Sequence, residues 1–332
     1  MRILVLVKQV PGTSNVAVDP ERGTLRREGV PAKTNPYDLH ALEVAFQIRE
    51  ELEKRIGMAG SSATSGAAGR SSDADGPSDG DGRRGTRGAE GAQAKVTVAA
   101  LSMGPPQAEA ALRECYWMGA DEGFLLTDRA FAGADTLATA FTLSQAAKKI
   151  GFDLIIAGMQ STDGDTAQVG PGVAEFLDIP HVSCVRAIGR VDARSIEVTA
   201  DLGDRYLTQE LSLPCLITVT RDLNQPRLPS FRARKETAGR PVVILKPDDL
   251  PPLGGPDGSE GSDRLDGPTG SERPEMTGQS RGSSERYHGL AGSPTRVEKI
   301  FPPKVDRVKE KWQGASSELA SRLAALLKEV LP

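Results

Sequence analysis

The sequence predicts an α/β fold in which a mostly parallel sheet carries helices on both faces. Two observations predict it. In the first 160 residues, short apolar runs of strand length alternate with longer stretches of helical periodicity. A strand that returns through a helix favours a parallel neighbour. Beyond residue 181, apolar runs follow one another with no helix between them, which indicates an antiparallel extension of the sheet.

The parallel part begins with a short apolar strand, and three more such strands follow it. These strands are expected at 3–7, 96–101, 123–127 and 153–157. The first helix begins at Asn35-Pro36, because Asn caps helices well and Pro suits the first helical position. Its apolar face is predicted to carry Leu42, Ala45, Phe46, Leu52 and Ile56. Two further helices are expected at 108–118, which Gly119 ends, and at 134–150.

Four apolar runs form the second part of the expected sheet, at 182–188, 195–200, 206–211 and 215–220. Alternating RSIEVTA and RYLTQEL indicate half-exposed antiparallel strands. The stretch 221–236, RDLNQPRLPSFRARKE, has no periodicity. Near the C-terminus, 315–331 is expected to be a helix with four leucines on one side, at positions 319, 323, 326 and 327.

Two glycine-rich segments interrupt this pattern. Residues 57–94 and 251–296 contain ten Gly each, and the first has no Leu, Ile, Val or aromatic residue. Neither can bury enough apolar surface to offset its ordering entropy, so we expect both to be disordered. The predicted organisation is therefore an α/β domain over 1–250 with one insertion, a second insertion over 251–296, and a C-terminal tail over 297–332 that packs on another chain.

Composition excludes several classes of function. The net charge is −4, and no basic stripe interleaved with aromatic residues is present, so we expect no nucleic-acid partner. No run reaches the roughly 18 apolar residues of a membrane span, so we expect no membrane insertion. The N-terminus resembles no signal peptide, and the three Cys are widely spaced. We therefore expect buried thiols in a reducing cytoplasm and no metal site.

The segment GMQSTDGDTAQVGPG, residues 158–172, follows a predicted strand and contains no Lys, Arg, His or Cys. Its glycines permit close backbone approach, and its hydroxyl and backbone N–H groups can bind phosphate without a cation. Asp163 or Asp165 can accept hydrogen bonds from ribose. Three other segments are expected at the same edge of the sheet, where ligands of such folds bind: 8–10, 35–38 and 102–104.

The segment therefore suits a nucleotide that is held by its backbone and sugar. A plain structural turn is the alternative, because glycines in a strand-to-helix connection are common. Neither the GxGxxG fingerprint nor the GxxxxGK[ST] phosphate loop is present, which disfavours nucleotide hydrolysis. DGD is not followed by the 12-residue ligand array of a calcium loop.

Six segments in this order resemble the β subunit of the electron-transferring flavoproteins, of the FixA type: VLVKQVPGT, NPYDLHALEVA, ALSMGP, MGADEGFLLTDRAFAGADT, GMQSTDGDTAQVGP and TVTRDLNQPRLPS. The resemblance implies an adenine-nucleotide-binding α/β domain and a heterodimer with an α subunit that carries FAD. It implies no catalytic side chain. The nucleotide contacts that it implies are Leu6, Asn35, Pro36, Tyr37, Asp38, Met103, Gln160, Ser161, Thr162, Asp163, Gly164, Asp165, Thr166, Ala167, Gln168, Val169 and Gly170.

The text DGDTAQVGP resembles the branch whose β subunit binds a second FAD, which takes hydride from NADH. In that branch one electron passes to ferredoxin or flavodoxin, and the other passes through the α-subunit FAD to an acyl-CoA-type dehydrogenase or a quinone oxidoreductase. The branch that binds structural AMP has an acid where Gly164 stands and a bulkier polar residue where Ala167 stands. Structural AMP in the same pocket, or a nucleotide-binding regulator without electron transfer, are the alternatives.

The resemblance also implies that an aliphatic residue in the loop that contains PRLPS anchors a dehydrogenase partner. Here the segment is shorter than in the family, and both Leu228 and Phe231 are candidates for the anchor. An apolar residue ringed by polar ones is often a partner contact, although it can also turn into the core.

Overall fold

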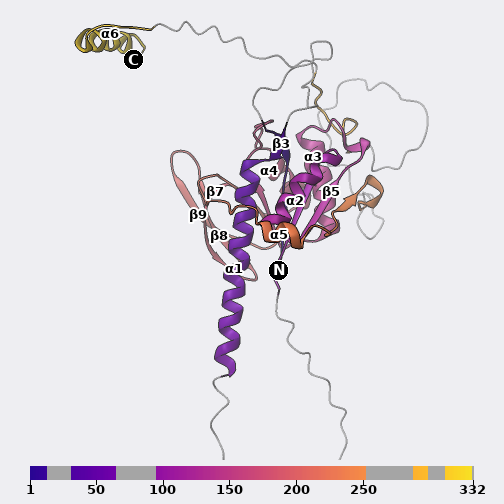
Figure 1. Ribbon diagram of the computed structural model, residues 1–332. Helices are drawn as coiled ribbons and strands as arrows, with labels where there is room; N and C mark the ends of the chain where they lie inside the picture. The colour runs from indigo at the N-terminus through magenta and orange to yellow at the C-terminus, as the bar shows by residue number, and fades with distance from the viewer. Residues whose placement is uncertain (13–30, 65–94, 252–286, 298–310, 331–332) are drawn as a thin grey trace, which may run out of the picture. The chain divides into compact units, whose positions relative to one another are not determined.

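The computed structural model describes residues 1–12, 31–64, 95–251, 287–297 and 311–330. Its main element is a nine-stranded sheet with the order β11-β5-β4-β1-β6-β10-β7-β8-β9 (Figure 1). The central strands β5, β4, β1, β6 and β10 are mutually parallel. Their bounds are β1 Arg2–Leu6, β4 Thr97–Met103, β5 Glu122–Leu126, β6 Leu154–Gly158 and β10 Cys215–Val219. The predicted α/β fold is confirmed.

Helices cover both faces of this sheet. On one face, α1 (Pro36–Thr64) and α2 (Glu109–Met118) pack against alternate residues of the parallel strands, such as Ile3 and Val98. On the other face, α3 (Thr136–Ile150) and α4 (Val169–Leu177) cover the intervening residues, such as Leu4 and Ala99. Both faces of the central strands are buried, which explains why these strands are uniformly apolar.

The second half of the sheet differs in part from the expectation. The strands β7 (His181–Val191), β8 (Ser195–Asp201) and β9 (Tyr206–Ser212) are antiparallel neighbours, as predicted. The fourth run, β10, instead lies between β6 and β7 and is parallel to both. All five residues of β10 are buried, so it belongs to the doubly covered part of the sheet.

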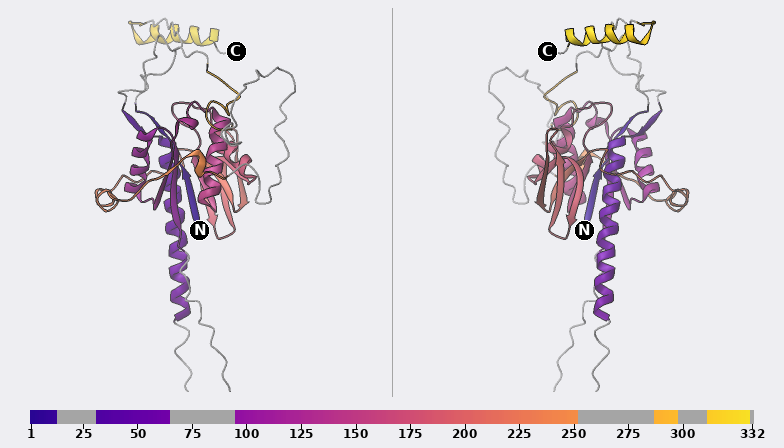
Figure 2. Two further views of the ribbon diagram at one scale, coloured as in Figure 1. Left: turned by 90° about the vertical axis from the view of Figure 1, so that its right-hand side faces the viewer. Right: turned by 90° about the vertical axis from the view of Figure 1, so that its left-hand side faces the viewer.

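The two helices expected at 108–118 and 134–150 are present as α2 and α3, each starting one or two residues later than expected. The side chain of Asp135 caps α3 by accepting from the N–H of Ala138, and Gly119 ends α2 with φ of 123°. Such a positive φ strains most residues but not glycine. Helix α1 continues to Thr64, so the first eight residues of the predicted insertion 57–94 are helical. Helix α1 extends past the end of the sheet (Figure 2), and the side chains of residues 51–56 are mostly exposed.

Four further short elements, three strands and one helix, were not predicted. The strands β2 (Gln9–Pro11) and β3 (Ala32–Thr34) form a separate antiparallel pair, and β11 (Val243–Leu245) joins the edge of the sheet beside β5. Within the stretch that lacks periodicity, α5 (Phe231–Glu236) is a six-residue helix. Ser230 caps it by accepting from the N–H of Ala233, a local signal that its short length concealed.

The described end of the second predicted insertion, residues 287–297, is packed against α3. His288 is buried, with its Nδ1 2.8 Å from Oγ1 of Thr142. The carboxylate of Asp135 accepts from the N–H and the hydroxyl of Thr295, at 3.1 and 2.8 Å. This stretch therefore departs from the expected disorder, because an aromatic contact to Phe141 and a helix cap hold it. Residues 65–94 and 252–286 lie outside the described residues.

Residues 311–330 belong to a separate unit. They contain α6 (Ser316–Val330), in agreement with the predicted C-terminal helix. Within this unit, the guanidinium of Arg322 lies 4.5 Å from the ring centroid of Trp312. Leu323, Leu326 and Leu327 of α6 are exposed.

Candidate functional site

The site lies where the order of the parallel strands reverses. From β1, the chain first builds outward through β4 and β5, and it then returns to place β6 on the other side of β1. Folds of this kind bind ligands beyond the carboxyl ends of the strands at such a point. The strands β1 and β6 end at Leu6 and Gly158, and the loop 159–168 follows β6 directly. The segments that the sequence analysis assigned to one edge therefore do meet there.

The buried carboxylate of Asp38 joins these segments. Its Oδ2 accepts from the backbone N–H of Lys8 at 2.7 Å, and its Oδ1 accepts from Nδ2 of Asn35 at 2.9 Å. A further backbone hydrogen bond comes from Gly158. A side chain at Gly158 would overlap Asp38 and would lie 2.6 Å from Cβ of Tyr37. Glycine at the end of β6 is thus required for the close approach of α1.

Burial raises the pKa of Asp38 from 3.8 to about 7. The hydrogen bonds from Lys8, Asn35 and Gly158 oppose this shift, because they favour the ionised form. Desolvation nevertheless wins, since Asp38 is only 5% exposed. The group at the centre of the site therefore titrates close to neutral pH.

Asn35 connects α1 to the loop after β6. Its Nδ2 also donates to the carbonyl of Gln160 at 2.9 Å, and its Oδ1 accepts from the N–H of Thr162 at 3.3 Å. We expected Asn35 to cap α1, but the hydrogen bond at its side-chain oxygen comes from the loop. The first turn of α1 and the loop are thereby held as one structure.

Lys8 supplies a cation that the loop itself lacks. Its Nζ lies 2.7 Å from Oδ1 of Asp163 and 3.3 Å from Oγ of Ser161. Burial acts to raise the pKa of Asp163, but the hydrogen bond and the charge of Lys8 outweigh it, and that pKa is lowered. The negative charge of Asp163 is therefore balanced within the protein.

The rest of the loop is exposed and partly strained. Asp165 and Ala167 both have φ of 54°, a conformation that costs roughly 1 kcal/mol for a residue other than glycine. Internal bonds hold it: the amide of Gln160 donates to the carboxylate of Asp165, and the hydroxyl of Thr136 donates to Oε1 of Gln168 at 3.0 Å. Strain that persists in this way is typical of ligand-binding segments.

The remaining predicted contacts are distributed over the elements around this edge. Leu6 is buried at the end of β1, and Met103 is half-buried as the last residue of β4. Pro36 begins α1, and the hydroxyl of Tyr37 accepts from Nε2 of Gln160 at 3.4 Å. The exposed residues of the loop are Thr162, Asp163, Gly164, Asp165, Thr166, Ala167 and Gln168, while Val169 and Gly170 begin α4.

The arrangement fits the phosphate groups of a nucleotide. No side chain caps the first N–H groups of α4, and such groups attract anions. Among the described residues, the hydroxyls of Ser102 and Thr220 are buried without a hydrogen-bond partner, and both lie at carboxyl ends of strands. Buried groups of this kind can accept a partner from outside the chain. Within the described ranges, no cluster of three or more His, Cys, Asp or Glu is arranged to hold a metal ion.

One residue of this edge was missed by the sequence analysis. Arg221 follows β10 by two residues, and its guanidinium carbon lies 5.0 Å from the ring centroid of Tyr37. The stretch 221–236 showed no periodicity, so only its position directly after a strand could have drawn attention to it.

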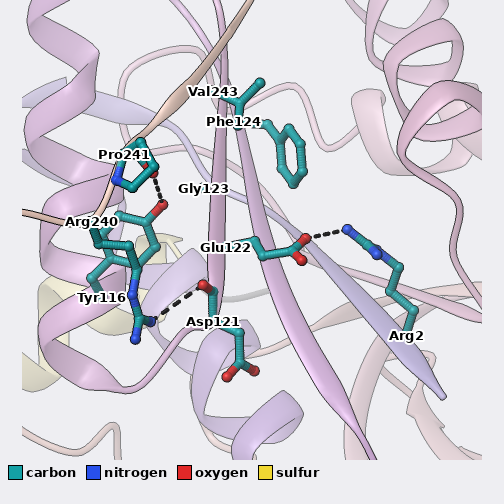
Figure 3. Close-up of a pocket in the computed structure, with 9 residues that line it drawn as sticks. All are labelled: Arg2, Tyr116, Asp121, Glu122, Gly123, Phe124, Arg240, Pro241 and Val243. Atoms are coloured by element: carbon teal, nitrogen blue, oxygen red, sulfur yellow. Dashed lines mark hydrogen bonds and ion pairs between the residues drawn. The ribbon is translucent and has the colours of Figure 1, made fainter.

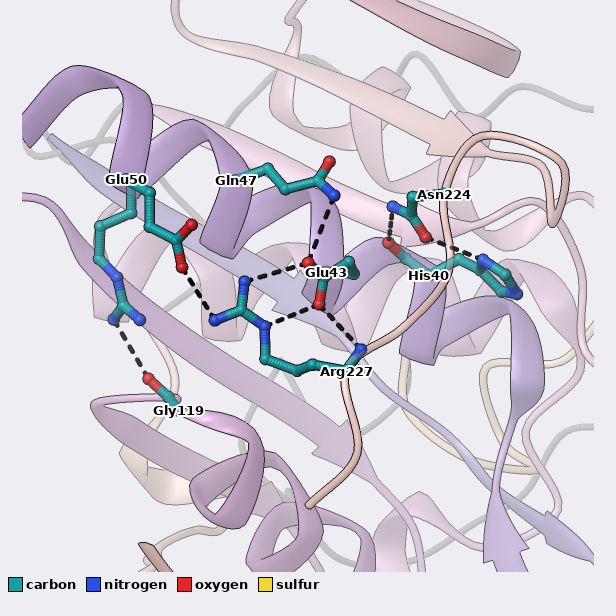
Figure 4. Close-up of polar contacts among 8 residues, drawn as sticks. His40, Glu43, Gln47, Glu50, Gly119, Asn224 and Arg227 are labelled. Carbon is teal, nitrogen blue, oxygen red and sulfur yellow. Dashed lines mark hydrogen bonds and ion pairs between the residues drawn. The ribbon is translucent and has the colours of Figure 1, made fainter. Parts of the chain in front are cut away.

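The two predicted partner residues lie on a neighbouring segment. Leu228 and Phe231 are 87% and 83% exposed, which excludes the alternative that they turn into the core. Arg227 fixes this segment to the middle of α1 (Figure 4): its Nε donates to Glu43 at 2.8 Å, and its terminal nitrogens donate to Glu43 and Glu50 at 3.0 and 2.9 Å.

A cavity of about 320 Å³ lies at the opposite edge of the sheet, near the amino ends of β1 and β5 (Figure 3). Its charged groups already have partners, since Arg2 pairs with Glu122 and Arg240 donates to the carbonyl of Ala120 at 2.9 Å. The hydroxyl of Tyr116 donates to the carbonyl of Pro241 at 2.7 Å. These contacts fasten residues 240–243 to the sheet and leave the cavity without a clear chemical role.

Comparison with known proteins agrees with this geometry. Residues 86–250 match the model of the electron transfer flavoprotein domain. The chain is 38% identical to an electron transfer flavoprotein subunit beta of Thermoanaerobacterium thermosaccharolyticum, over 98% of both chains. It is 36% identical to the caffeyl-CoA reductase-Etf complex subunit CarD of Acetobacterium woodii, over 99% of this chain and 98% of that one. The chain is 34% identical to Protein FixA of Sinorhizobium fredii, over 98% of this chain and 94% of that one.

The chain belongs to the family of electron transfer flavoprotein beta subunits. The predicted family is thus confirmed, and with it a role in electron transfer. Beta subunits of this family pair with an alpha subunit. Among the described helices, none is both long enough and apolar enough to cross a membrane.

The raised pKa of Asp38 predicts a specific pH dependence of stability. Above pH 3.8 the unfolded chain releases this proton, whereas the folded beta subunit keeps it until about pH 7. The free energy of unfolding should therefore fall as the pH rises from 4 to 7, by roughly 4 kcal/mol at most, and then stay level. Urea unfolding of the wild type and Asp38→Asn at several pH values measures this contribution. The prediction would be wrong if the free energies of unfolding of the wild type and of Asp38→Asn changed with pH in parallel.

Substitutions at Gly164 test whether the phosphates of a nucleotide lie beside this part of the loop. Its φ is not positive, and a Cβ there would lie 3.6 Å from Oγ of Ser161 and 4.0 Å from Nζ of Lys8, so neither Ala nor Asp should disturb the fold. Gly164→Asp adds a negative charge, which should weaken the binding of a nucleotide phosphate about tenfold. Gly164→Ala is the matched control and should bind normally. Nucleotide occupancy of the purified variants gives the answer; full occupancy with Asp would refute this placement of the phosphates.

Proposed function

We propose that the chain is the beta subunit of a heterodimeric electron transfer flavoprotein that binds FAD at the site beyond β1 and β6. FAD would supply the chemistry there, by accepting hydride from NADH. One of its electrons would go to ferredoxin or flavodoxin, and the other would go, by way of the alpha-subunit FAD, to an acyl-CoA-type dehydrogenase or a quinone oxidoreductase. The chain itself contributes binding, orientation and electrostatics. The three free thiols, Cys115, Cys184 and Cys215, agree with a cytoplasmic location.

The observation that favours FAD over AMP is the open space at Gly164. No protein atom lies within 3.5 Å of a Cβ built at this position, and the backbone does not require glycine. Gly158 and Gly170 differ, because a Cβ at either one would overlap a neighbouring side chain. A missing side chain that the fold does not need leaves room for a ligand. Ala167 likewise has a small side chain, which leaves space beside it.

The charges of the site support binding without hydrolysis. Asp163 is paired with Lys8, and Asp165 is bound by Gln160. No described residue of the loop provides the lysine of a hydrolytic phosphate loop. Structural AMP in the same pocket is the second candidate, since it uses the same adenine and ribose contacts. The relatives that are named for a caffeyl-CoA reductase complex and as FixA favour the first candidate.

We further propose that the tail 297–332 packs on the alpha subunit. Within its described part, α6 has three exposed leucines, Leu323, Leu326 and Leu327, at a spacing that places them on one helical face. A helix of this kind is stabilised when its apolar face is covered. The alpha subunit is the partner that the family supplies.

The flavin content of the purified heterodimer tests the proposal most directly. We expect two FAD per heterodimer, one in each subunit, and reduction of the beta-site FAD by NADH. Release of the cofactors by denaturation, followed by chromatography with absorbance detection, counts both FAD and AMP. One FAD together with one AMP would rule out bifurcation and leave the family assignment intact.

Leu228 and Phe231 predict a docking site for the partner dehydrogenase. Their replacement by Ala together should remove an interface contact of about 2 to 4 kcal/mol, so that electron delivery at subsaturating partner falls tenfold or more. Reduction of the bound flavin by NADH should persist. Both rates, electron delivery to a purified acyl-CoA dehydrogenase and flavin reduction by NADH, are measured on the same preparation of the double variant.

Leu207→Ala serves as the matched control for this docking prediction, because Leu207 is 45% exposed but lies on the edge strand β9. It should leave both rates unchanged. Equal losses of both rates in the Leu228 and Phe231 double variant, or loss of the heterodimer, would assign these residues to folding and discard the docking role.

A further inference from the structure

Arg221 lies at the carboxyl edge, and no described carboxylate neutralises it. Lys8, at the same edge, is held by Asp163 at 2.7 Å. Within the part of the chain that the structure describes, no carboxylate lies within ion-pair distance of Arg221, and its neighbour Asp222 does not pair with it either. The site thus contains a guanidinium whose hydrogen-bond donors are available to a ligand.

The position of Arg221 is determined by the fold and not by a loose loop. It follows β10, which is hydrogen-bonded to β6 in parallel register, and the N–H of Met159 donates to the carbonyl of Val219 at 2.9 Å. The N–H of Thr220 donates in turn to the carbonyl of Val185 at 2.9 Å. The backbone on the N-terminal side of Arg221 is therefore anchored beside the start of the loop that follows β6.

The ring of Tyr37 supports the side chain of Arg221. The guanidinium carbon lies 5.0 Å from the ring centroid, within the range of a cation–π contact. Tyr37 is itself only 9% exposed, and its hydroxyl accepts from Gln160 of the loop. Stacking leaves the edges of the planar guanidinium free to donate, and this fork matches the oxygens of a phosphate.

A second observation concerns the residue directly before Arg221 in the chain. The hydroxyl of Thr220, directly before Arg221, is one of three buried side-chain polar atoms without a hydrogen-bond partner in the described residues. Buried polar atoms are nearly always paired, so this hydroxyl can accept a partner from outside the chain.

We propose that Arg221, held on the ring of Tyr37, binds the phosphate groups of a nucleotide at this site. The inference rests on the proposed function, and it adds a residue to that site. The chemistry is shared by two sources, the resident nucleotide and the reduced nicotinamide dinucleotide that donates hydride. In either case Arg221 discriminates phosphorylated ligands from the bare nucleoside.

The test uses the full chain in its heterodimer, depleted of nucleotide, and titrates it calorimetrically with ADP and with adenosine. Arg221→Gln should weaken ADP binding about tenfold and leave adenosine binding unchanged, because only the charged contact is removed. Arg221→Lys should recover part of the loss, since it keeps the charge but lacks the planar fork. Arg205→Gln is the matched control: Arg205 is an exposed arginine in the turn between β8 and β9.

Two further measurements separate the sources. If Arg221 contacts the resident nucleotide, Arg221→Gln lowers FAD or AMP retention on purification while the KM for NADH stays constant. If it contacts the donor, retention is normal and the KM for NADH rises about tenfold with kcat preserved. Either result supports the inference.

Equal ADP affinity in the wild type and Arg221→Gln, or an equal loss of adenosine binding, would overturn the role of Arg221. Failure of the wild-type heterodimer to bind any of these nucleotides would instead contradict the proposed function itself.

Discussion

The buried carboxylate of Asp38 is the interaction on which the candidate site depends. It holds the end of β1 through Lys8, the start of α1 through Asn35, and the end of β6 through Gly158. Two backbone N–H groups and one side-chain amide therefore converge on one carboxylate. The cost of burying this carboxyl appears as its raised pKa. In return, the first turn of α1 and the loop after β6 are preorganised before any ligand arrives.

Helix α1 carries two regions of function on one rigid element. Its first turn provides Tyr37 and Asp38 to the nucleotide site, while Glu43 and Glu50, farther along, hold Arg227 of the exposed segment. A reciprocal pair between His40 and Asn224, at 2.9 and 3.1 Å, lies between them. The segment 221–230 therefore follows α1 from the nucleotide site to the proposed docking residues. Their separation is set by one helix and not by flexible connections.

The loop after β6 contains no cationic residue, so other parts of the chain must supply the positive charge for an anionic ligand. In the proposed function, the positive charge comes from Arg221 after β10, while Lys8 after β1 balances Asp163, and the loop supplies backbone N–H groups, hydroxyls and space. Glycines within this loop and at its two ends have different physical roles. Gly158 and Gly170 permit close packing within the protein, whereas Gly164 faces no protein atom closely. Only Gly164 therefore leaves volume that a ligand can use.

The sequence by itself determined the parallel core, because strands buried on both faces must be uniformly apolar and their helices amphipathic. It also determined the family, through six motifs in order, and the candidate loop. The tertiary structure alone decided that β10 is inserted between β6 and β7, that residues 287–297 pack on α3, and that Arg221 lies on Tyr37. These features depend on contacts between residues about 35 to 184 positions apart. Local periodicity carries no information about such contacts, which arise only when the sheet assembles.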